Sequence, residues 1–255
     1  MTIEIVIVPC LEDNYAYLIH NPAQKKTCLI DVPEAKPIIE VLEKRAWNLE
    51  KIVLTHHHSD HVAGLGELLR SYQASVYGAT ADANRLPVLD TELKENDKFY
   101  LGNIEFLVMD AYGHTIGHIA LYSKELSAVF SGDSLMTLGC GRLFEGSPEI
   151  MWDTLQKFCL LPPQTKIYSG HEYSEKNAQF ALSIDPNNKK LQERASLIRE
   201  LRSNGFPTVP STIESELDTN PFVRSGNHNL KRLLGMSQQK DSNVLAELRR
   251  RRDVF

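Results

Sequence analysis

The chain has 255 residues, of which 42% are hydrophobic and 24% charged, and its formal net charge is -5. A chain of this length and composition can form one large globular domain with a smaller appendage and a substantial core. The net negative charge argues against broad binding of nucleic acid, and no apolar run approaches the length of a membrane span. We therefore expect neither nucleic acid nor a membrane as a partner.

The cysteine pattern indicates a reducing environment. Cys10, Cys28, Cys140 and Cys159 form no C-x-x-C pair, which predicts neither a disulfide framework nor a zinc ribbon. Residues 1–8 alternate as an edge strand does and lack the positive region of a signal peptide. We expect a cytoplasmic protein, and a monomer, because no long apolar stripe requires a partner.

The predicted elements change in character along the chain. In chain order, the pattern predicts a strand over 28–30, a helix over 36–47, a strand over 51–55, a helix over 62–70, strands over 104–109 and 128–130, a helix over 149–161 and a strand over 166–168. Helices then follow at 174–184, 189–204 and 243–252, with turns at 185–188 and 205–210. We therefore expect an α/β domain over residues 1–173 and an all-helical domain over residues 174–255.

The most informative stretch is residues 55–61, T-H-H-H-S-D-H, on the turn between a predicted strand and a predicted helix. Side chains alternate in an extended segment, so His56 and His58 point to one side. Asp60 and His61 fall at the helix entry, where the free N–H groups and the helix dipole favour a carboxylate. Convergence on two neighbouring points predicts two adjacent metal ions. A surface histidine tract, or an Asp60 that only caps the helix, is the alternative.

Three further strand ends carry histidine or aspartate beside glycine, in G-H-T-I-G-H at 113–118, S-G-D-S at 131–134 and S-G-H-E-Y at 169–173. These three stretches are candidates for further metal ligands. Glycine lets the backbone turn sharply and approach a ligand, so the pattern predicts a site built from loops at one edge of a layered sheet. His57 is expected to point away from the metals, and Asp31 to be a turn residue or a hydrogen-bond partner of a ligand.

With these residues the chain resembles the metallo-β-lactamase superfamily, through an H-x-H-x-D-H series followed by His, Asp and His. The resemblance runs from residue 1 to about 173 and implies an αβ/βα four-layer sandwich, two mixed sheets face to face with helices outside. It also implies two divalent ions, the first held by His56, His58 and His114, the second by Asp60, His61 and His171, with Asp133 bridging both. Zinc suits these ligands best, and iron and manganese accept similar ones.

Other motifs resemble those of the glyoxalase II (hydroxyacylglutathione hydrolase) family. They are G-C-G-R-L-F-E-G at 139–146, G-H-E-Y at 170–173, T-N-P-F-V-R at 219–224 and R-R-R-R-D-V-F at 249–255. The resemblance implies that glutathione is bound by Arg142, Phe144, Tyr173, Arg249 and Arg252. Many members have tyrosine where Phe144 stands. Guanidinium groups pair with carboxylates bidentately, whereas the alternative for the arginine run is a solvated helix end.

The expected activity is hydrolysis of S-(2-hydroxyacyl)glutathione, chiefly S-D-lactoylglutathione to D-lactate and glutathione, the second step of methylglyoxal detoxification. Two divalent ions lower the pKa of a shared water to roughly neutral, and the resulting hydroxide attacks the thioester. Asp60 is expected to orient that hydroxide while the metals stabilise the oxyanion. A thiol pKa of about 8.5 makes the thiolate a good leaving group.

Three alternatives remain open at this point. Another superfamily hydrolase, acting on a β-lactam, a lactone or an RNA phosphodiester, would share the metal ligands but not the C-terminal motifs. An oxidoreductase of the flavo-diiron branch would have glutamate in place of His58, and a persulfide dioxygenase would normally lack the helical extension. A non-catalytic metal-binding module would usually have lost Asp60 or His61.

Overall fold

The computed structural model describes residues 2–255, so Met1, the first residue of the expected edge strand, lies outside the described part. The chain divides into two compact units. Unit 1 comprises the residues up to Ala111 together with Ile116–Gly132, and unit 2 comprises Tyr112–Thr115 and Asp133–Phe255.

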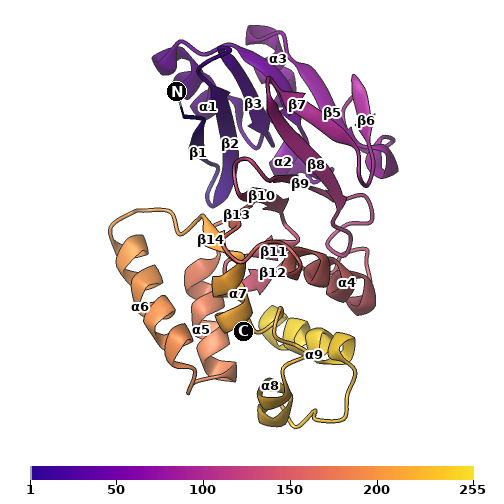
Figure 1. Cartoon of the computed structure of the whole chain (residues 1–255), viewed down its shortest axis with the longest axis vertical. Helices are drawn as coiled ribbons and strands as arrows, with labels where there is room; N and C mark the ends of the chain where they lie inside the picture. Colours follow the sequence, from indigo (N-terminus) through magenta and orange to yellow (C-terminus); the bar gives the residue numbers. More distant parts are fainter. Residues whose placement is uncertain (1) are drawn as a thin grey trace. The chain divides into compact units, whose positions relative to one another are not determined.

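The first layer of unit 1 is a six-stranded mixed sheet in the order β1-β2-β3-β4-β5-β6 (Figure 1). Its strands are β1 (Glu4–Cys10), β2 (Asn14–Asn21), β3 (Lys26–Ile30), β4 (Leu49–Val53), β5 (Ser75–Ala79) and β6 (Thr91–Leu93). β1 to β3 pair antiparallel, whereas β3 to β6 pair parallel. Parallel neighbours require a crossover, which α1 (Ala35–Arg45) supplies between β3 and β4 and α3 (Leu65–Ser71) between β4 and β5.

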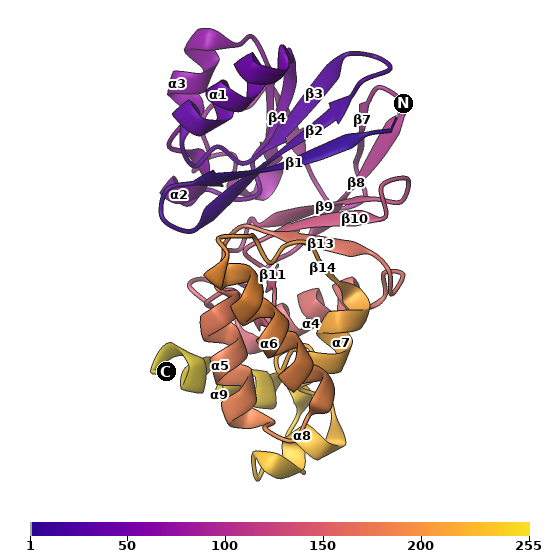
Figure 2. The ribbon, with the colours of Figure 1, turned by 90° about the vertical axis from the view of Figure 1, so that its left-hand side faces the viewer.

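In the second sheet, all the strands of unit 1 pair antiparallel. The strands that unit 1 contributes to it are β7 (Lys98–Leu101), β8 (Ile104–Asp110), β9 (Ile119–Ser123) and β10 (Ala128–Gly132), paired in chain order. The two sheets face each other, because the ring of Tyr17 packs edge-on at 5.5 Å from Phe130 and the ring of Tyr77 lies 5.8 Å from Phe99. Helices α1 and α3 cover the opposite face of the first sheet (Figure 2). The expected sandwich is confirmed.

The core of unit 1 follows from the alternation of side chains along β2, which is buried on both faces. Leu18 points to the helical side and packs in a cluster with Ile38 and Leu42 of α1 and Leu68 of α3. Tyr17, its neighbour, points to the second sheet. Each fully buried leucine or isoleucine contributes about 1.5–3 kcal/mol to folding, so this double burial rigidly anchors the strands.

Unit 2 carries most of the helices and only short strands. Its elements are β11 (Leu135–Met136), β12 (Gly139–Cys140), α4 (Pro148–Cys159), β13 (Lys166–Ser169), α5 (Ser174–Ile184), α6 (Lys189–Ser203), β14 (Ser211–Thr212), α7 (Ile213–Thr219), α8 (His228–Leu233) and α9 (Asp241–Asp253). α5 and α6 lie side by side, and α9 packs on α4 (Figure 1). The helices expected at 174–184, 189–204 and 243–252 are confirmed. The shorter α7 and α8 were not predicted.

Two sequence features of the helical tail set where its helices begin. The Asn188 side chain accepts a hydrogen bond from Leu191 N at the start of α6, as asparagine commonly does at a helix N-terminus. Thr212 does the same for Ser215 N at the start of α7. Within residues 2–255, no helix combines the length and the apolar character needed to cross a membrane.

Candidate metal centre

The histidine-rich turn follows β4, as expected, but the helix after it is divided. Ser59–Val62 form a separate short helix, α2, with His58 at its N-cap, and α3 begins only at Leu65. The expectation of one helix over residues 62–70 is therefore wrong at its start. Gly64 separates the two helices, and a Cβ there would lie 2.6 Å from the backbone nitrogen of Ala35, which requires glycine. Asp60 and His61 do lie at a helix entry.

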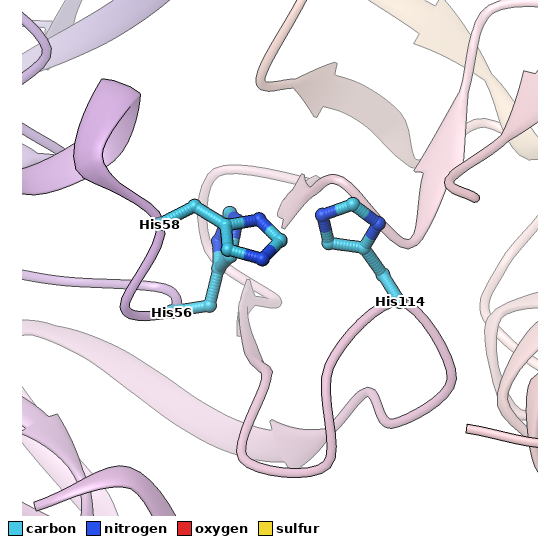
Figure 3. A group of neighbouring side chains, drawn as sticks. All are labelled: His56, His58 and His114. Atoms are coloured by element: carbon cyan, nitrogen blue, oxygen red, sulfur yellow. The ribbon is translucent and has the colours of Figure 1, made fainter. Parts of the chain in front are cut away.

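His56 and His58 present different ring nitrogens to the same point. His56 Nε2 lies 3.1 Å from His58 Nδ1, and the ring centroids are 4.7 Å apart in an edge-to-face arrangement (Figure 3). Thr55 Oγ1 donates to a carboxylate, so it accepts from the Nδ1–H of His56 at 3.0 Å. That assignment places the lone pair of His56 on Nε2, the nitrogen that faces His58.

Asp31 organises this turn from the end of β3. Its Oδ1 accepts from Thr55 N at 2.8 Å, and its Oδ2 lies 2.8 Å from both Thr55 Oγ1 and His61 Nδ1. A carboxylate only accepts, so Nδ1 of the buried His61 carries the proton and Nε2 keeps its lone pair. Asp31 thereby fixes the tautomer of His61 directly and that of His56 through Thr55. This hydrogen bond to the candidate ligand His61 agrees with the role expected for Asp31.

Asn14 was not found by sequence reasoning, although it contacts the central carboxylate of the turn. Its Nδ2 donates to the Asp60 carbonyl oxygen at 2.9 Å and to Asp60 Oδ2 at 3.2 Å. The carboxylate of Asp60 in turn lies 3.8 Å from His61 Nε2. Asn14 begins β2 and lies 46 residues before Asp60 in the chain, so no local pattern could reveal the contact.

His57 belongs to none of the groups of donor atoms within residues 2–255 that could hold a metal ion, although its ring lies 4.9 Å from that of His58. Its Nδ1 donates to Oδ2 of the fully buried Asp82 at 3.0 Å, and Arg85 pairs with the same carboxylate. His118 is also buried, and its ring stacks 4.8 Å from that of His56. Both residues therefore support the turn by packing and hydrogen bonding.

The remaining predicted ligands lie together in unit 2. His114 Nδ1 donates to the backbone carbonyl of Arg142 at 2.8 Å, so its Nε2 faces Asp133 Oδ2 at 3.6 Å. His171 Nε2 lies 3.2 Å from the same carboxylate oxygen. The buried Asp133 thus has an imidazole nitrogen on each side. A carboxylate between two imidazoles is suited to share a metal with either.

Three sets of donor atoms are compact enough for a metal ion. The first set, His56, His58 and His114, is drawn in Figure 3. The other two are His56, His61 and Asp133, and Asp60, His61 and His171, and within each of the three sets the ligand atoms lie within 4.8 Å of one another. Every ligand predicted from the sequence belongs to at least one set. Imidazole and carboxylate groups that are mostly buried are the donors that zinc and other divalent transition metals prefer. The residues therefore fit divalent metal binding.

The cationic residues predicted to bind substrate also cluster, within unit 2. Burial lowers the pKa of Arg252, and the neighbouring guanidinium groups of Arg249 and Arg142 lower it further, whereas Asp253 and Tyr173 act in the opposite direction. A bound anion would reduce the repulsion between these neighbouring positive charges. Arg252 Nε donates to Asn177 Oδ1 at 3.2 Å, which fixes the side chain.

The predicted aromatic residues contact candidate ligands. Tyr173 stacks on His171 with ring centroids 4.8 Å apart, and Phe144 packs edge-on against His114 at 5.3 Å. Phe144 is 60% exposed, so one face of its ring is open to a substrate. Arg249 differs from the other predicted substrate residues because it is buried and donates to the Cys140 carbonyl oxygen at 2.8 Å.

A family model and two solved structures first identify the superfamily to which the chain belongs. The family model described as "Metallo-beta-lactamase superfamily" matches residues 13–171. ETHE1 from Myxococcus xanthus is 22% identical with a TM-score of 0.67, covering 100% of this chain and 99% of its own. TTHA1623 in a di-iron-bound form is 26% identical with a TM-score of 0.58, covering 66% and 91%. The protein is thus an α/β protein of the metallo-β-lactamase superfamily.

The helical tail and the full-length relatives narrow the family further. The model described as "Hydroxyacylglutathione hydrolase C-terminus" matches residues 172–255. Hydroxyacylglutathione hydrolase of Roseobacter denitrificans is 51% identical over 255 residues, 100% of both chains. That of Ruegeria pomeroyi is 52% identical over the same span, and that of Methylococcus capsulatus 44% over 253 residues, 99% of both chains. The chain belongs to the hydroxyacylglutathione hydrolase family.

Proposed function

We propose that this protein is a metal-dependent thioester hydrolase that cleaves S-(2-hydroxyacyl)glutathione, chiefly S-D-lactoylglutathione to D-lactate and glutathione. This would be the second step of methylglyoxal detoxification. One observation carries the proposal: a complete set of candidate metal ligands and a cluster of neighbouring arginines occur in a chain that matches hydroxyacylglutathione hydrolases over its whole length. Neither feature alone would specify the substrate.

We propose two divalent ions as the cofactors, with zinc first and iron or manganese as alternatives. His56, His58 and His114 would hold one ion, Asp60, His61 and His171 the other, and Asp133 would be shared. The donor chemistry and the short distances within the three sets of atoms support this assignment. The di-iron form of one structural neighbour supports keeping iron as an alternative.

The chemistry proposed for the site assigns separate tasks to the protein groups. When bound, the divalent ions would lower the pKa of a water molecule and polarise the carbonyl group under attack. Asp60 accepts a hydrogen bond from the attacking water and orients it, and Asn14 holds that carboxylate in place from β2. Asp31 keeps the lone pairs of His56 and His61 on Nε2. The thiolate leaving group, with a pKa near 8.5 as a free thiol, needs little general-acid assistance.

Glutathione carries two carboxylates, and the cationic cluster of unit 2 is suited to bind them. We assign this role to Arg142, whose side chain is 62% exposed, and to Arg252, whose partly buried charge strengthens any ion pair that it forms. Tyr173, which stacks on His171, and Phe144, which packs against His114, would both contact the bound tripeptide. Arg249 remains a predicted member of this site, although its guanidinium group is bonded within the protein.

The proposed organisation is a catalytic domain over residues 1–173 and a helical substrate-binding domain over 174–255. The boundaries of the two matched family models, at 171 and 172, support it. We also propose a monomer in the cytoplasm. The four free cysteines, with Cys10, Cys28 and Cys140 buried, support a reducing compartment. Burial raises the pKa of Cys10 and of Cys28 to about 12, so these thiols are poorly reactive.

Steady-state hydrolysis of S-D-lactoylglutathione by the purified full-length protein tests the proposal. The metal-replete protein should turn over the substrate, the chelator-stripped protein should not, and Zn²⁺, Fe²⁺ or Mn²⁺ should restore turnover. A thioester without glutathione and a β-lactam serve as matched substrates, and both should react far more slowly. Absence of turnover by a folded, metal-loaded protein would refute the proposal, and oxygen consumption with glutathione persulfide would then test the dioxygenase alternative.

A further inference from the structure

A buried carboxylate, that of Glu172, lies in the segment between β13 and α5 (residues 170–173), between two residues of the candidate site. His171 precedes it and Tyr173 follows it, and the rings of these two residues stack 4.8 Å apart. The side chain of Glu172 is only 5% exposed. Burial of a carboxylate is costly unless hydrogen bonds or an opposite charge compensate for it, so the partners of Glu172 indicate its role.

These partners come from both ends of a long stretch of unit 2. Glu172 Oε2 accepts from Thr208 N at 2.8 Å, and Oε1 accepts from Thr208 Oγ1 at 2.8 Å. Oε1 also accepts from Ser174 Oγ and, at 3.3 Å, from Ser174 N. Arg202 Nη1 lies 3.8 Å from Oε2. Thr208 lies 36 residues further along the chain, in the loop between α6 and β14, so the carboxylate connects the β13–α5 segment to the helical tail.

The same carboxylate fixes the start of α5. Tyr173 occupies the N-cap position, but its side chain makes no capping hydrogen bond. The first N–H groups of a helix have no partner within the helix, and the first one here, Ser174 N, donates to Glu172 instead. Glu172 therefore holds the backbone between the stacked rings of His171 and Tyr173 and the direction in which α5 leaves it.

We propose that Glu172 is a positioning residue for the metal centre. By holding the β13–α5 segment against the loop at Thr208, it sets the place of the His171 imidazole, whose Nε2 lies 3.2 Å from Asp133 Oδ2. Distances between a metal and its ligands are fixed to within about 0.2 Å, so a small displacement of this segment weakens metal binding. The inference rests on the proposed function and deepens it.

The position of Glu172 in the chain gives this role a wider meaning. The superfamily model ends at His171, and the model of the hydroxyacylglutathione hydrolase C-terminus begins at Glu172. The donors to the Glu172 carboxylate, Thr208 and Ser174, lie in the region of the second model. The helical tail therefore supports a candidate metal ligand in addition to contributing candidate substrate contacts.

Zinc affinity tests this role, because the measurement needs no thioester. Zinc-loaded full-length protein is titrated with a competing chelator, for the unchanged chain, Glu172→Gln, Thr208→Val and the double variant. Glutamine replaces one accepting oxygen by an NH2 group, and valine removes the hydroxyl group without a change of charge. We expect each single variant to weaken zinc binding about three- to tenfold, less than the loss of a direct hydrogen-bond partner of a ligand. The double variant should lose less than the product of the two single losses, because both variants break one contact.

Two control variants separate positioning from general effects on charge and stability. Glu175→Gln removes the same charge from the exposed start of α5 and should leave the zinc affinity unchanged. Asp185→Asn weakens the ion pair with Arg224, 2.8 Å long and mostly buried, at the other end of α5. It should lower the free energy of unfolding and leave the zinc affinity unchanged.

An unchanged zinc affinity in Glu172→Gln, or an equal loss in Asp185→Asn, would overturn the inference. Losses that multiply fully in the double variant would also contradict it, because Glu172 and Thr208 would then act independently. If circular dichroism shows that Glu172→Gln does not fold, Thr208→Val decides alone, and an unchanged zinc affinity there refutes the role. Failure of the proposed function would instead appear as absence of thioester turnover in the unchanged, zinc-loaded protein.

Discussion

The two groups of candidate ligands are held in different ways. In unit 1, Asp60 and the histidines of residues 56–61 lie on one short turn, and side chains distant in the sequence orient them, chiefly the carboxylate of Asp31. In unit 2, the ligands come from three separate loops, and His114 is oriented by a backbone carbonyl oxygen. A carboxylate partner adds negative charge to the ligand that it holds, whereas a carbonyl partner transmits the position of its loop. We therefore expect the metal affinity of the first group to depend on the charge of its partner, and that of the second group to depend on the position of the loop that orients His114.

The largest expected effect comes from the carboxylate in the turn itself. Asp60→Asn should lower kcat about 100- to 1000-fold, because an amide neither binds a metal as well nor orients a water as an ionised acceptor does. Steady-state kinetics on the metal-loaded protein measures the loss. Asp153→Asn, an exposed aspartate on α4, is the control and should retain full activity. A loss below tenfold would show that the Asp60 carboxylate is needed neither to bind a metal nor to orient the water.

The second-largest effect tests whether the negative charge of Asp31 strengthens zinc binding by the histidine-rich turn. Asp31→Asn keeps the size of the side chain and a residue type that tolerates φ of 58° but removes the charge, so zinc affinity should fall about 10- to 100-fold. Asp82→Asn is the matched variant, because Asp82 holds His57, which belongs to none of the sets of donor atoms that could bind a metal ion. It should destabilise the fold and leave zinc affinity unchanged. Equal losses in both variants would contradict the distinction between the two carboxylates.

A smaller effect is expected at the cationic cluster of unit 2. Arg252→Met should raise KM for the glutathione thioester about 10- to 100-fold with kcat unchanged, because a charge-assisted hydrogen bond contributes about 1.5–3 kcal/mol to binding in ground and transition states alike. Arg252→Lys should recover part of the loss. If kcat falls instead, Arg252 acts on the reaction step, and its assignment to glutathione binding fails.

The smallest effect concerns the aromatic residue beside His114. Phe144→Tyr adds a hydroxyl group to a ring that is 60% exposed, and a new hydrogen bond to substrate would lower KM about two- to tenfold. Unfolding in urea should be unaffected, since the added oxygen faces solvent in the free protein. An unchanged KM would mean that the edge of this ring does not face glutathione.

The sequence predicts the turn well because its information is local. An apolar strand, a compact run of histidines and a helix entry all lie within a few residues, so alternation alone separates His56 and His58 from His57. Its supporting residues could not be predicted in the same way. Asn14 and Asp82 reach the turn only through the sheet pairing and crossovers of unit 1, and no single segment encodes that arrangement.

The ligands of unit 2 and the helical tail show the complementary limit. Glycines beside His114, Asp133 and His171 indicate loops at strand ends. Only the family resemblance indicates which of these residues binds which metal ion. The division of the helix at Gly64 was missed, because the close approach of Ala35 that requires glycine is a tertiary contact. The motif T-N-P-F-V-R was noted without a physical role, and the structure gives Asn220 one as a donor to the Met136 and Gly139 carbonyl oxygens.

The left-handed backbone of Asp31 has a consequence for protein design. A residue at φ of 58° with a short carboxylate that reaches Thr55 and His61 together leaves almost no alternative side chain at this position. The histidine-rich turn therefore cannot be moved into another protein by itself. A scaffold that receives residues 55–61 must also supply an adjacent parallel strand that ends in a left-handed aspartate, or the grafted imidazoles will lack defined tautomers.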